Sequence, residues 1–259
     1  MSNIDSNKQI DEYQLGQNHV IESMWLKFSN NSQGSWITKV PECIKLHEYL
    51  AKLQPKHILE LGTGIGCSTE IMAFSCPNTS IYTIEQNPKC IAIAKTLIAE
   101  RLQQQIYFRH AKVAALKPIY EVSPFVHFLA YHTPFDWRNY DFIFVDGPGP
   151  IMAKMKNPDN GEVWEVLAEL PGADVILLLP RMNEGTIVYI DKRKQMVMLY
   201  KRHLAHYLEL VDDARGYTIF RRNAKPLKLD LSDFQNSDST YMDLKSNGYF
   251  EEVPQEQNI

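Results

Sequence analysis

Short apolar runs alternate with amphipathic segments along most of the chain, and this alternation constrains the fold more than any other feature. Strand–helix units in series build a mostly parallel sheet that helices cover on both faces. Five runs have strand character: His57–Leu61, Ser80–Ile84, Ile106–Arg109, Tyr140–Val145 and Thr186–Ile190. Two later runs, Leu208–Val211 and Tyr217–Arg221, flank a tight connection and should pair antiparallel. The sequence of 259 residues thus predicts an α/β fold, a Rossmann-like three-layer sandwich whose seven-stranded, mostly parallel sheet ends in an antiparallel hairpin.

Two amphipathic helices are predicted before this alternation begins. The first covers the apolar stripe Val20–Phe28, and the second opens at Pro41, a residue favoured in the first turn of a helix. The apolar face of the second helix comprises Cys43, Leu46, Leu50 and Leu53. We expect an N-terminal helical cap at residues 1–56, the Rossmann-like domain at residues 57–225 and a polar C-terminal tail at residues 226–259.

The segments between the strands are predicted mostly as helices. Cys67–Ser75 follows the first strand, and Asn87 with Pro88 starts a helix after the second. The apolar stripe of that helix comprises Ile91, Ala94, Ile98 and Leu102. Later helices are expected over Tyr120–Tyr131, near Val163–Leu170, over Val175–Leu179 with Asp174 as its cap, and after the fifth strand. The polar stretch from Gly147 to Gly161 is expected to be irregular, and a stretch of this length in a compact domain is usually functional or mobile.

Composition and charge argue against several kinds of partner. The formal net charge is −4 without a long basic run, whereas non-specific nucleic-acid binding needs a strong positive field. No window approaches the roughly 18 continuous apolar residues of a membrane span. The four cysteines form no CxxC pair and fit reduced thiols. We therefore expect a cytoplasmic protein without nucleic-acid or membrane partners, and the sequence gives no indication of its oligomeric state.

The stretch ELGTGIGCS, residues 60–68, carries the strongest chemical signal. Gly62, Gly64 and Gly66 alternate directly after a strand, so that the backbone can turn sharply and approach a ligand closely. The N–H groups of the following helix then point at that ligand. The spacing G-x-G-x-G differs from the G-x-G-x-x-G of a dinucleotide loop. Glu60 at the end of the strand can accept hydrogen bonds from an ammonium group but would repel a pyrophosphate, which favours a cationic nucleoside as the ligand.

Three more acids follow predicted strands. Glu85 closes the second strand, where a carboxylate can accept both hydroxyls of a ribose. Asp146 and Asp191 follow the fourth and fifth strands, at the sheet edge where open α/β sheets bind ligands. A cap for the helix from Lys192 onward is an equally good interpretation of Asp191. The basic run Lys192-Arg193-Lys194 is interpreted as a solvated helix face rather than an anion site.

The run Ile58–Ser68, together with Glu85 and Val145-Asp146-Gly147, resembles the class I S-adenosylmethionine-dependent methyltransferases, and within them the small-molecule O-methyltransferase branch. The resemblance extends from about Pro41 to Arg222 and implies the strand order 3-2-1-4-5-7-6. It implies roles in cofactor binding for a set of matching residues. Glu60, Gly62, Thr63 and Gly64 would hold the methionine part, and Glu85 would hold the ribose. His110 and Ala111 would lie by the adenine, and Asp146 would face the methyl group or a metal. Gly66, Ser68 and Gln86 complete the predicted cofactor-binding set.

One departure from that family concerns a metal. Its metal-dependent members carry an Asp-Asn pair after the fifth strand, where this chain has Asp191-Lys192. A protonated lysine cannot ligate Mg²⁺, and its charge repels the cation, so we predict no required metal. A neutral acceptor would need a general base, for which the candidate catalytic residues are Asp146, Asp191 and Lys192.

The sequence thus predicts a methyltransferase that uses S-adenosylmethionine to methylate a small-molecule acceptor, with oxygen as the expected methylated atom. Two alternatives remain open. One is a NAD-dependent or aminopropyl-transfer enzyme on a related sheet; the NAD version calls for a glycine where Cys67 stands. The other is a sensor or assembly subunit that binds S-adenosylmethionine without transferring its methyl group.

Overall fold

A seven-stranded sheet is the centre of the fold. The computed structural model describes residues 3–31, 37–116, 119, 122, 128–132, 139–149, 151–156, 163–168, 170–227 and 229. The strand order is β10-β11-β9-β6-β1-β2-β3. Its strands are β1 (His57–Leu61), β2 (Ser80–Glu85), β3 (Ile106–His110), β6 (Phe142–Val145), β9 (Ile187–Asp191), β10 (Leu208–Asp213) and β11 (Tyr217–Arg222). β1, β2 and β3 run parallel, while β11 is antiparallel to both β9 and β10. The predicted fold class, strand order and final hairpin are confirmed.

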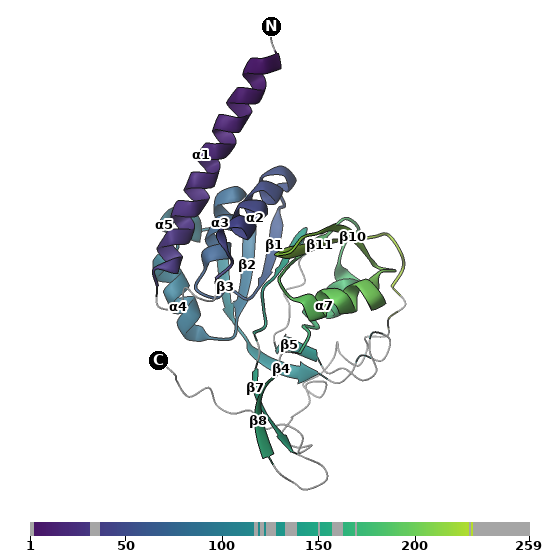
Figure 1. Cartoon of the computed structure of the whole chain (residues 1–259). Coiled ribbons are helices and arrows are strands. Elements are labelled where there is room, and N and C mark those ends of the chain that lie inside the picture. The colour runs from purple at the N-terminus through teal and green to yellow at the C-terminus, as the bar shows by residue number, and fades with distance from the viewer. Residues whose placement is uncertain are drawn as a thin grey trace. The chain divides into compact units, whose positions relative to one another are not determined.

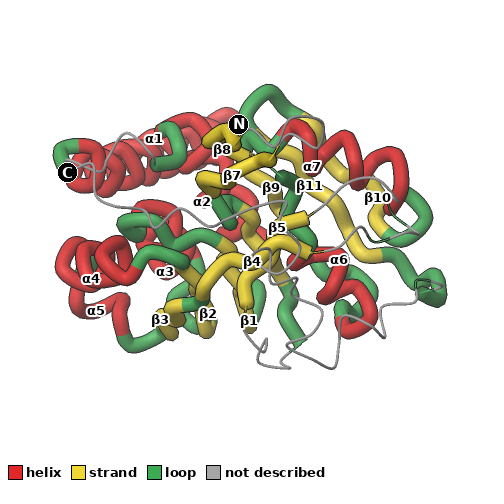
Figure 2. Tube along the Cα trace, turned by 90° about the horizontal axis from the view of Figure 1, so that it is seen from below, coloured by secondary structure: helices red, strands yellow, loops and turns green. Residues whose placement is uncertain are grey.

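The chain divides into two compact units, of which the first comprises residues 1–110 and 140–144. Its helices are α1 (Asn3–Ser29), α2 (Val40–Leu53), α3 (Cys67–Ser75), α4 (Pro88–Leu97) and α5 (Glu100–Gln103). α1 is the long purple helix of Figure 1, and its C-terminal part contacts α2 and α3. Figure 2 shows β1, β2 and β3 side by side, flanked by α3, α4 and α5. This unit contains the strand–loop–helix segment that the sequence singles out.

Local sequence signals set the helix ends of the first unit. The Asn87 side chain accepts a hydrogen bond from the Lys89 N–H at 3.0 Å, so the predicted cap of α4 is present. α2 buries the predicted face except Leu53, which is 39% exposed. The predicted apolar stripe from Ile91 to Leu102 is buried. The helix α4 nevertheless ends at Leu97, because the backbone of Ile98 is extended. The next N–H group, that of Ala99, donates to Glu70 Oε1 at 3.0 Å.

The second unit comprises residues 111–139 and 145–259 and contains two small antiparallel hairpins. The first pairs β4 (Lys112–Leu116) with β5 (Phe128–His132), and the second pairs β7 (Ile151–Lys156) with β8 (Val163–Ala168). The helix predicted over Tyr120–Tyr131 is wrong from Phe128 onward, the helix near Val163–Leu170 is wrong over Val163–Ala168, and part of the stretch Gly147–Gly161 is strand rather than irregular. In each case a partner strand supplies the backbone hydrogen bonds, which apolar periodicity alone does not reveal.

The remaining helices of the second unit agree better with the sequence. α6 (Asp174–Leu178) confirms the short helix, and the turn η2 (Leu179–Arg181) continues it. Asp174, however, is not its cap: the N-cap position is Ala173, and Asp174 Oδ1 accepts from the Tyr131 N–H at 3.0 Å. α7 (Lys194–Leu199) and the π-helical turn η3 (Tyr200–Leu204) form the amphipathic segment after β9, and they bury Met196, Tyr200 and Leu204.

Within the described part of the chain, no helix combines the length and the apolar character needed to cross a membrane. The polar tail predicted at residues 226–259 lies almost entirely outside the described residues. The division into a cap, a domain and a tail stays a prediction.

An ion pair ties α1 to α3 and gives a test of the first unit. Lys27 Nζ pairs with Glu70 Oε2, whose side chain is 2% exposed, whereas that of Lys27 is 35% exposed. Lys27→Met keeps the methylenes but leaves a buried carboxylate without its cation. We expect the free energy of unfolding in urea to fall by about 1–2 kcal/mol, a value reduced by the partial exposure of Lys27.

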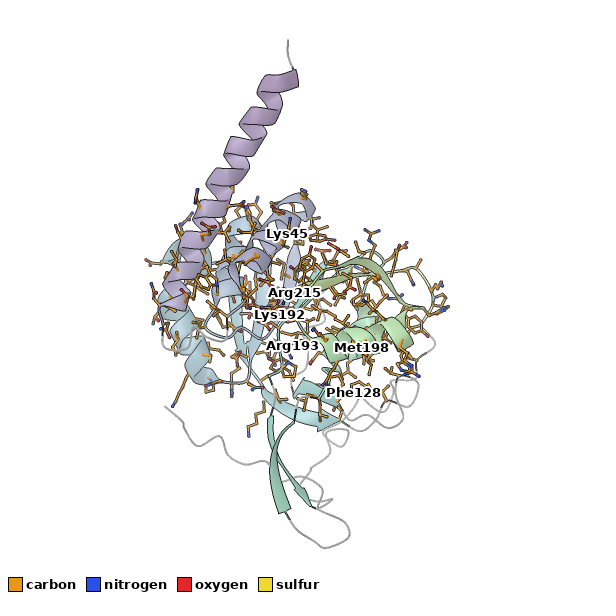
Figure 3. All side chains as sticks on the ribbon, in the orientation of Figure 1. Lys45, Phe128, Lys192, Arg193, Met198 and Arg215 are labelled. Atoms are coloured by element: carbon orange, nitrogen blue, oxygen red, sulfur yellow. The ribbon has the colours of Figure 1, made fainter. Side chains whose placement is uncertain are left out.

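The matched control is Lys45→Met. Lys45, labelled in Figure 3, pairs with Glu48 on the surface, where the two side chains are 54% and 31% exposed. An exposed pair contributes little, so this variant should change stability by less than about 0.5 kcal/mol. Equal losses in the two variants would contradict the structural importance of the Lys27–Glu70 pair.

Candidate functional site

The loop after β1 is a tight turn that depends on glycine. Gly62, Gly64 and Gly66 have φ values of 98°, 52° and 95°, in the left-handed region that glycine adopts without strain. The N–H groups of Gly62 and Thr63 both donate to Ile84 O, at 2.9 and 3.2 Å, and so join the loop to the end of β2. A Cβ at Gly66 would lie 2.8 Å from Ile98 Cδ1, so glycine also permits the close approach of α3 to the α4 segment. The backbone of the loop is thereby fixed beside the ends of two parallel strands.

Glu60 is the polar centre of this segment and is fully buried. Its Oε1 accepts from Ser68 Oγ at 2.6 Å, and its Oε2 accepts from Thr69 Oγ1 and Thr83 Oγ1, also at 2.6 Å. These hydroxyls belong to α3 and β2, so one carboxyl group joins β1, β2 and α3. Thr63 is part of the same network, because its Oγ1 lies 2.5 Å from Thr83 Oγ1.

Burial raises the pKa of Glu60 to about 7, although the hydrogen bonds from Ser68, Thr69 and Thr83 favour its charged form and oppose the shift. The nearby charge of Glu85 raises it further. The carboxyl group therefore gains and loses its proton in the neutral range.

Glu85 joins the glycine loop to the turn after β2. Its Oε2 accepts from the Gly64 N–H at 2.8 Å, and its Oε1 accepts from the Asn87 N–H at 2.9 Å. Each oxygen of a carboxylate has two lone pairs, so both can still accept a ligand hydroxyl. The residue is 7% exposed and is held in one position from two sides.

The other predicted residues of the adenine side lie where β2 and β3 end. His110 pairs in register with Glu85, and its ring Nε2–H donates to Gln86 O at 3.0 Å. His110 is exposed. Ala111, the first residue of the second unit, is 4% exposed.

In the second unit, Asp146 lies in a loop that one arginine holds. Arg193 Nη1 donates to Pro148 O at 2.7 Å, and Arg193 Nη2 donates to Asp146 O. The same Nη2 lies 3.7 Å from Asp146 Oδ1. The peptide bond between Gly147 and Pro148 is cis. Arg193, labelled with Lys192 in Figure 3, is therefore not solvated as the sequence predicts, whereas Lys192 and Lys194 are exposed.

Asp191 is the last residue of β9 and pairs with Lys192, which follows the strand. Lys192 Nζ lies 3.6 Å from Asp191 Oδ2, and the Asp191 side chain is 4% exposed. Asp191 does not cap the next helix, because the N-cap position of α7 is Arg193. Lys192 has a φ of 52°, a strained conformation for a non-glycine residue, and its N–H donates to Gly216 O at 3.2 Å. Among the described residues, no group of three or more His, Cys, Asp or Glu side chains is arranged to hold a metal ion.

Sequence reasoning missed two kinds of residue near these acids. Thr83 and Thr69 hold Glu60, and Arg193 holds the loop of Asp146. A threonine in the middle of the apolar strand β2 is the one available signal, because a polar residue in a buried strand needs a partner. Arg193 stands in a basic run, and nothing in the run distinguishes it from its neighbours.

Comparison with solved structures finds similar methyltransferases. A putative caffeoyl-CoA O-methyltransferase from Staphylococcus aureus is 16% identical, covers 84% of this chain and 99% of its own, and superimposes with a TM-score of 0.52. The SAH-bound methyltransferase PaMTH1 from Podospora anserina is 13% identical over 86% of this chain and 97% of its own, with a TM-score of 0.49. A putative O-methyltransferase from Klebsiella pneumoniae is 16% identical over 79% and 90%, with a TM-score of 0.47.

No protein-family model matches the chain. Identities this low establish the fold alone. The Staphylococcus aureus protein and the strand order together show that this chain has the Rossmann-like fold of the class I methyltransferases.

The raised pKa of Glu60 predicts a pH-dependent stability. The unfolded chain releases this proton near pH 4.5 and the folded chain near pH 7, so the folded state binds more protons between these values. Stability should therefore fall as the pH rises through this window, by about 3 kcal/mol in total from Glu60. Glu60→Gln has no titrating group at this position, so its free energy of unfolding in urea should depend less on pH. Between pH 5 and pH 7 the slope of that free energy against pH should be smaller than the wild-type slope by about 1.4 kcal/mol per pH unit.

A second buried acid provides the control. Burial also raises the pKa of Asp174 to about 7. Asp174→Asn should therefore remove its own contribution to the slope of the unfolding free energy against pH, and the double variant should remove the contributions of both acids. If Glu60→Gln kept the wild-type slope, Glu60 would not be the buried titrating acid described here.

Proposed function

We propose that this chain is a methyltransferase that binds S-adenosylmethionine at the loop Gly62–Gly66 and methylates a small-molecule acceptor, with oxygen as the methylated atom. The single observation that carries the proposal is the position of Glu85, whose two oxygens accept from the Gly64 and Asn87 N–H groups. A carboxylate joined to the glycine loop suits a ribose with two hydroxyls. A dinucleotide is disfavoured separately, because the spacing of the glycines is G-x-G-x-G and Cys67 stands where the third glycine of a dinucleotide loop would be.

Within this proposal, Glu60 acts through the loop rather than on the cofactor. Its oxygens already accept from Ser68, Thr69 and Thr83, and the residue has no exposed surface. We assign it the task of holding β1, β2 and α3 in the arrangement that gives the loop its shape. Gly62, Thr63, Gly64, Gly66 and Ser68 would then surround the methionine part, and Gln86, His110 and Ala111 the adenine.

The cofactor would supply a sulfonium methyl group, which is already activated for transfer. The protein then has to align the acceptor for in-line attack, and a base is needed only for a neutral acceptor. Asp146, Asp191 and Lys192 are the residues we propose for this side of the reaction. No metal is included, since the charge of Lys192 opposes a divalent cation beside Asp191.

Two other functions would be indicated by different results of the binding and activity tests. A NAD-dependent enzyme would need the loop to accommodate a pyrophosphate without a glycine at the position of Cys67. A sensor or assembly subunit would bind S-adenosylmethionine or S-adenosylhomocysteine and methylate nothing. We expect the protein to act in the cytoplasm.

Glu85→Ala tests the proposal directly. Calorimetric titration of the wild-type protein should show binding of S-adenosylmethionine and none of NAD. Loss of the Glu85 carboxylate should weaken S-adenosylmethionine binding by about 1–3 kcal/mol, the usual effect of losing hydrogen bonds to a charged group. Glu209→Ala, at an exposed acid of β10, is the matched control and should bind as the wild type does. Unchanged affinity in Glu85→Ala, or tighter binding of NAD than of S-adenosylmethionine, would contradict the assignment.

A further inference from the structure

Arg193 differs from its basic neighbours in where its guanidinium lies. Its side chain is 25% exposed, and two of its nitrogens point into the loop after β6. Nη1 donates to Pro148 O at 2.7 Å, while Nη2 donates to Asp146 O and lies 3.7 Å from the Asp146 carboxylate. One side chain thus binds two carbonyls and the acid of a single short loop.

Arginine is chemically suited to this arrangement. A planar guanidinium presents N–H groups in a rigid fork and can donate to two acceptors at fixed positions at once. The ammonium of a lysine has one nitrogen on a flexible stem and cannot span both carbonyls in the same way. The contact therefore fixes backbone positions and does more than balance the charge of Asp146.

A second acid lies close enough to this arginine to be affected by its charge. Asp174 is 1% exposed, its Oδ1 accepts from the Tyr131 N–H at 3.0 Å, and its buried Oδ2 accepts no hydrogen bond from the described residues. The charge of Arg193 lowers the pKa of this acid, against the larger effect of burial. Tyr200, the other titratable group close enough to be affected, donates to Gly172 O at 3.2 Å, and burial and Asp174 raise its pKa.

Gly172 shows how closely the loop and this acid pack. A Cβ at Gly172 would lie 3.6 Å from Pro148 Cδ and 3.9 Å from Asp174 Oδ2. The proline ring and the buried carboxylate therefore both border the space that a side chain at this position would fill. Arg193 holds the loop by hydrogen bonds, and Gly172 leaves room for the Pro148 ring.

We infer that Arg193 is a positioning residue for Asp146, and that its positive charge acts on Asp174 as well as on Asp146. The inference rests on the proposed function, because it gives Asp146 a reason to be held on the acceptor side. Transfer from a sulfonium needs the acceptor aligned, and an acid with a fixed backbone and a fixed carboxylate can serve that alignment. Arg193 then holds the loop of Asp146 through two carbonyl oxygens and lies within ion-pair distance of the Asp146 carboxylate.

The test compares Arg193→Gln and Arg193→Lys with Arg202→Gln, an exposed arginine of the same helical segment. NMR measures amide exchange at Gly147 and Gly149 and the carboxyl titration of Asp174. In Arg193→Gln we expect exchange at both glycines to be about tenfold faster, and Asp174 to titrate at higher pH than in the wild type. In Arg193→Lys exchange should also be faster, but Asp174 should titrate near its wild-type midpoint because the positive charge remains.

Arg202→Gln should change neither property, and wild-type exchange in β9 and β11 would show that each variant is folded. Wild-type exchange at Gly147 and Gly149 in Arg193→Lys would overturn the inference, as would an unmoved Asp174 titration in Arg193→Gln. Calorimetric titration of the wild-type protein with S-adenosylmethionine tests the proposed function separately from the role of Arg193. Failure to bind S-adenosylmethionine would contradict the proposed function, whereas the amide exchange and the carboxyl titration of Asp174 decide the role of Arg193.

Discussion

The buried carboxyl group of Glu60 is the interaction on which the first unit depends. It accepts hydrogen bonds from hydroxyls on α3 and β2 while its own backbone lies in β1, so three elements meet at one side chain. A buried acid is costly unless its oxygens are fully bonded, and three short hydrogen bonds meet that requirement here. The turn Gly62–Gly66 connects these same elements, and its shape follows from their arrangement.

Charge then limits what this turn can bind. Glu85 reaches the loop through the Gly64 N–H and places a carboxylate at the end of β2, where related sheets bind a ribose. The second unit uses charge in a comparable way, because Arg193 fixes the loop of Asp146 through two carbonyl oxygens. In both units a charged side chain sets the backbone of a loop that follows a strand of the main sheet.

The sequence predicted those parts of the fold whose signals are local. Asn87 before Pro88 marks the start of α4, and the glycines after β1 mark the turn. The strands β4, β5, β7 and β8 were out of reach, because each depends on a partner that no local pattern identifies, as with Val113 opposite Tyr131. The same reason applies to the site. Glu60 and Glu85 stand in recognisable positions, whereas the inward turn of Arg193 depends on contacts with a loop far away in the sequence.

The most direct test of this account is a crystal structure of the protein grown with S-adenosylhomocysteine. The account predicts electron density for the nucleoside beside Gly62–Gly66, with both ribose hydroxyls within hydrogen-bonding distance of the Glu85 carboxylate and with Glu60 still bonded to Ser68, Thr69 and Thr83. Density at another place on the molecule, or a nucleoside at this loop whose ribose does not contact Glu85, would contradict it.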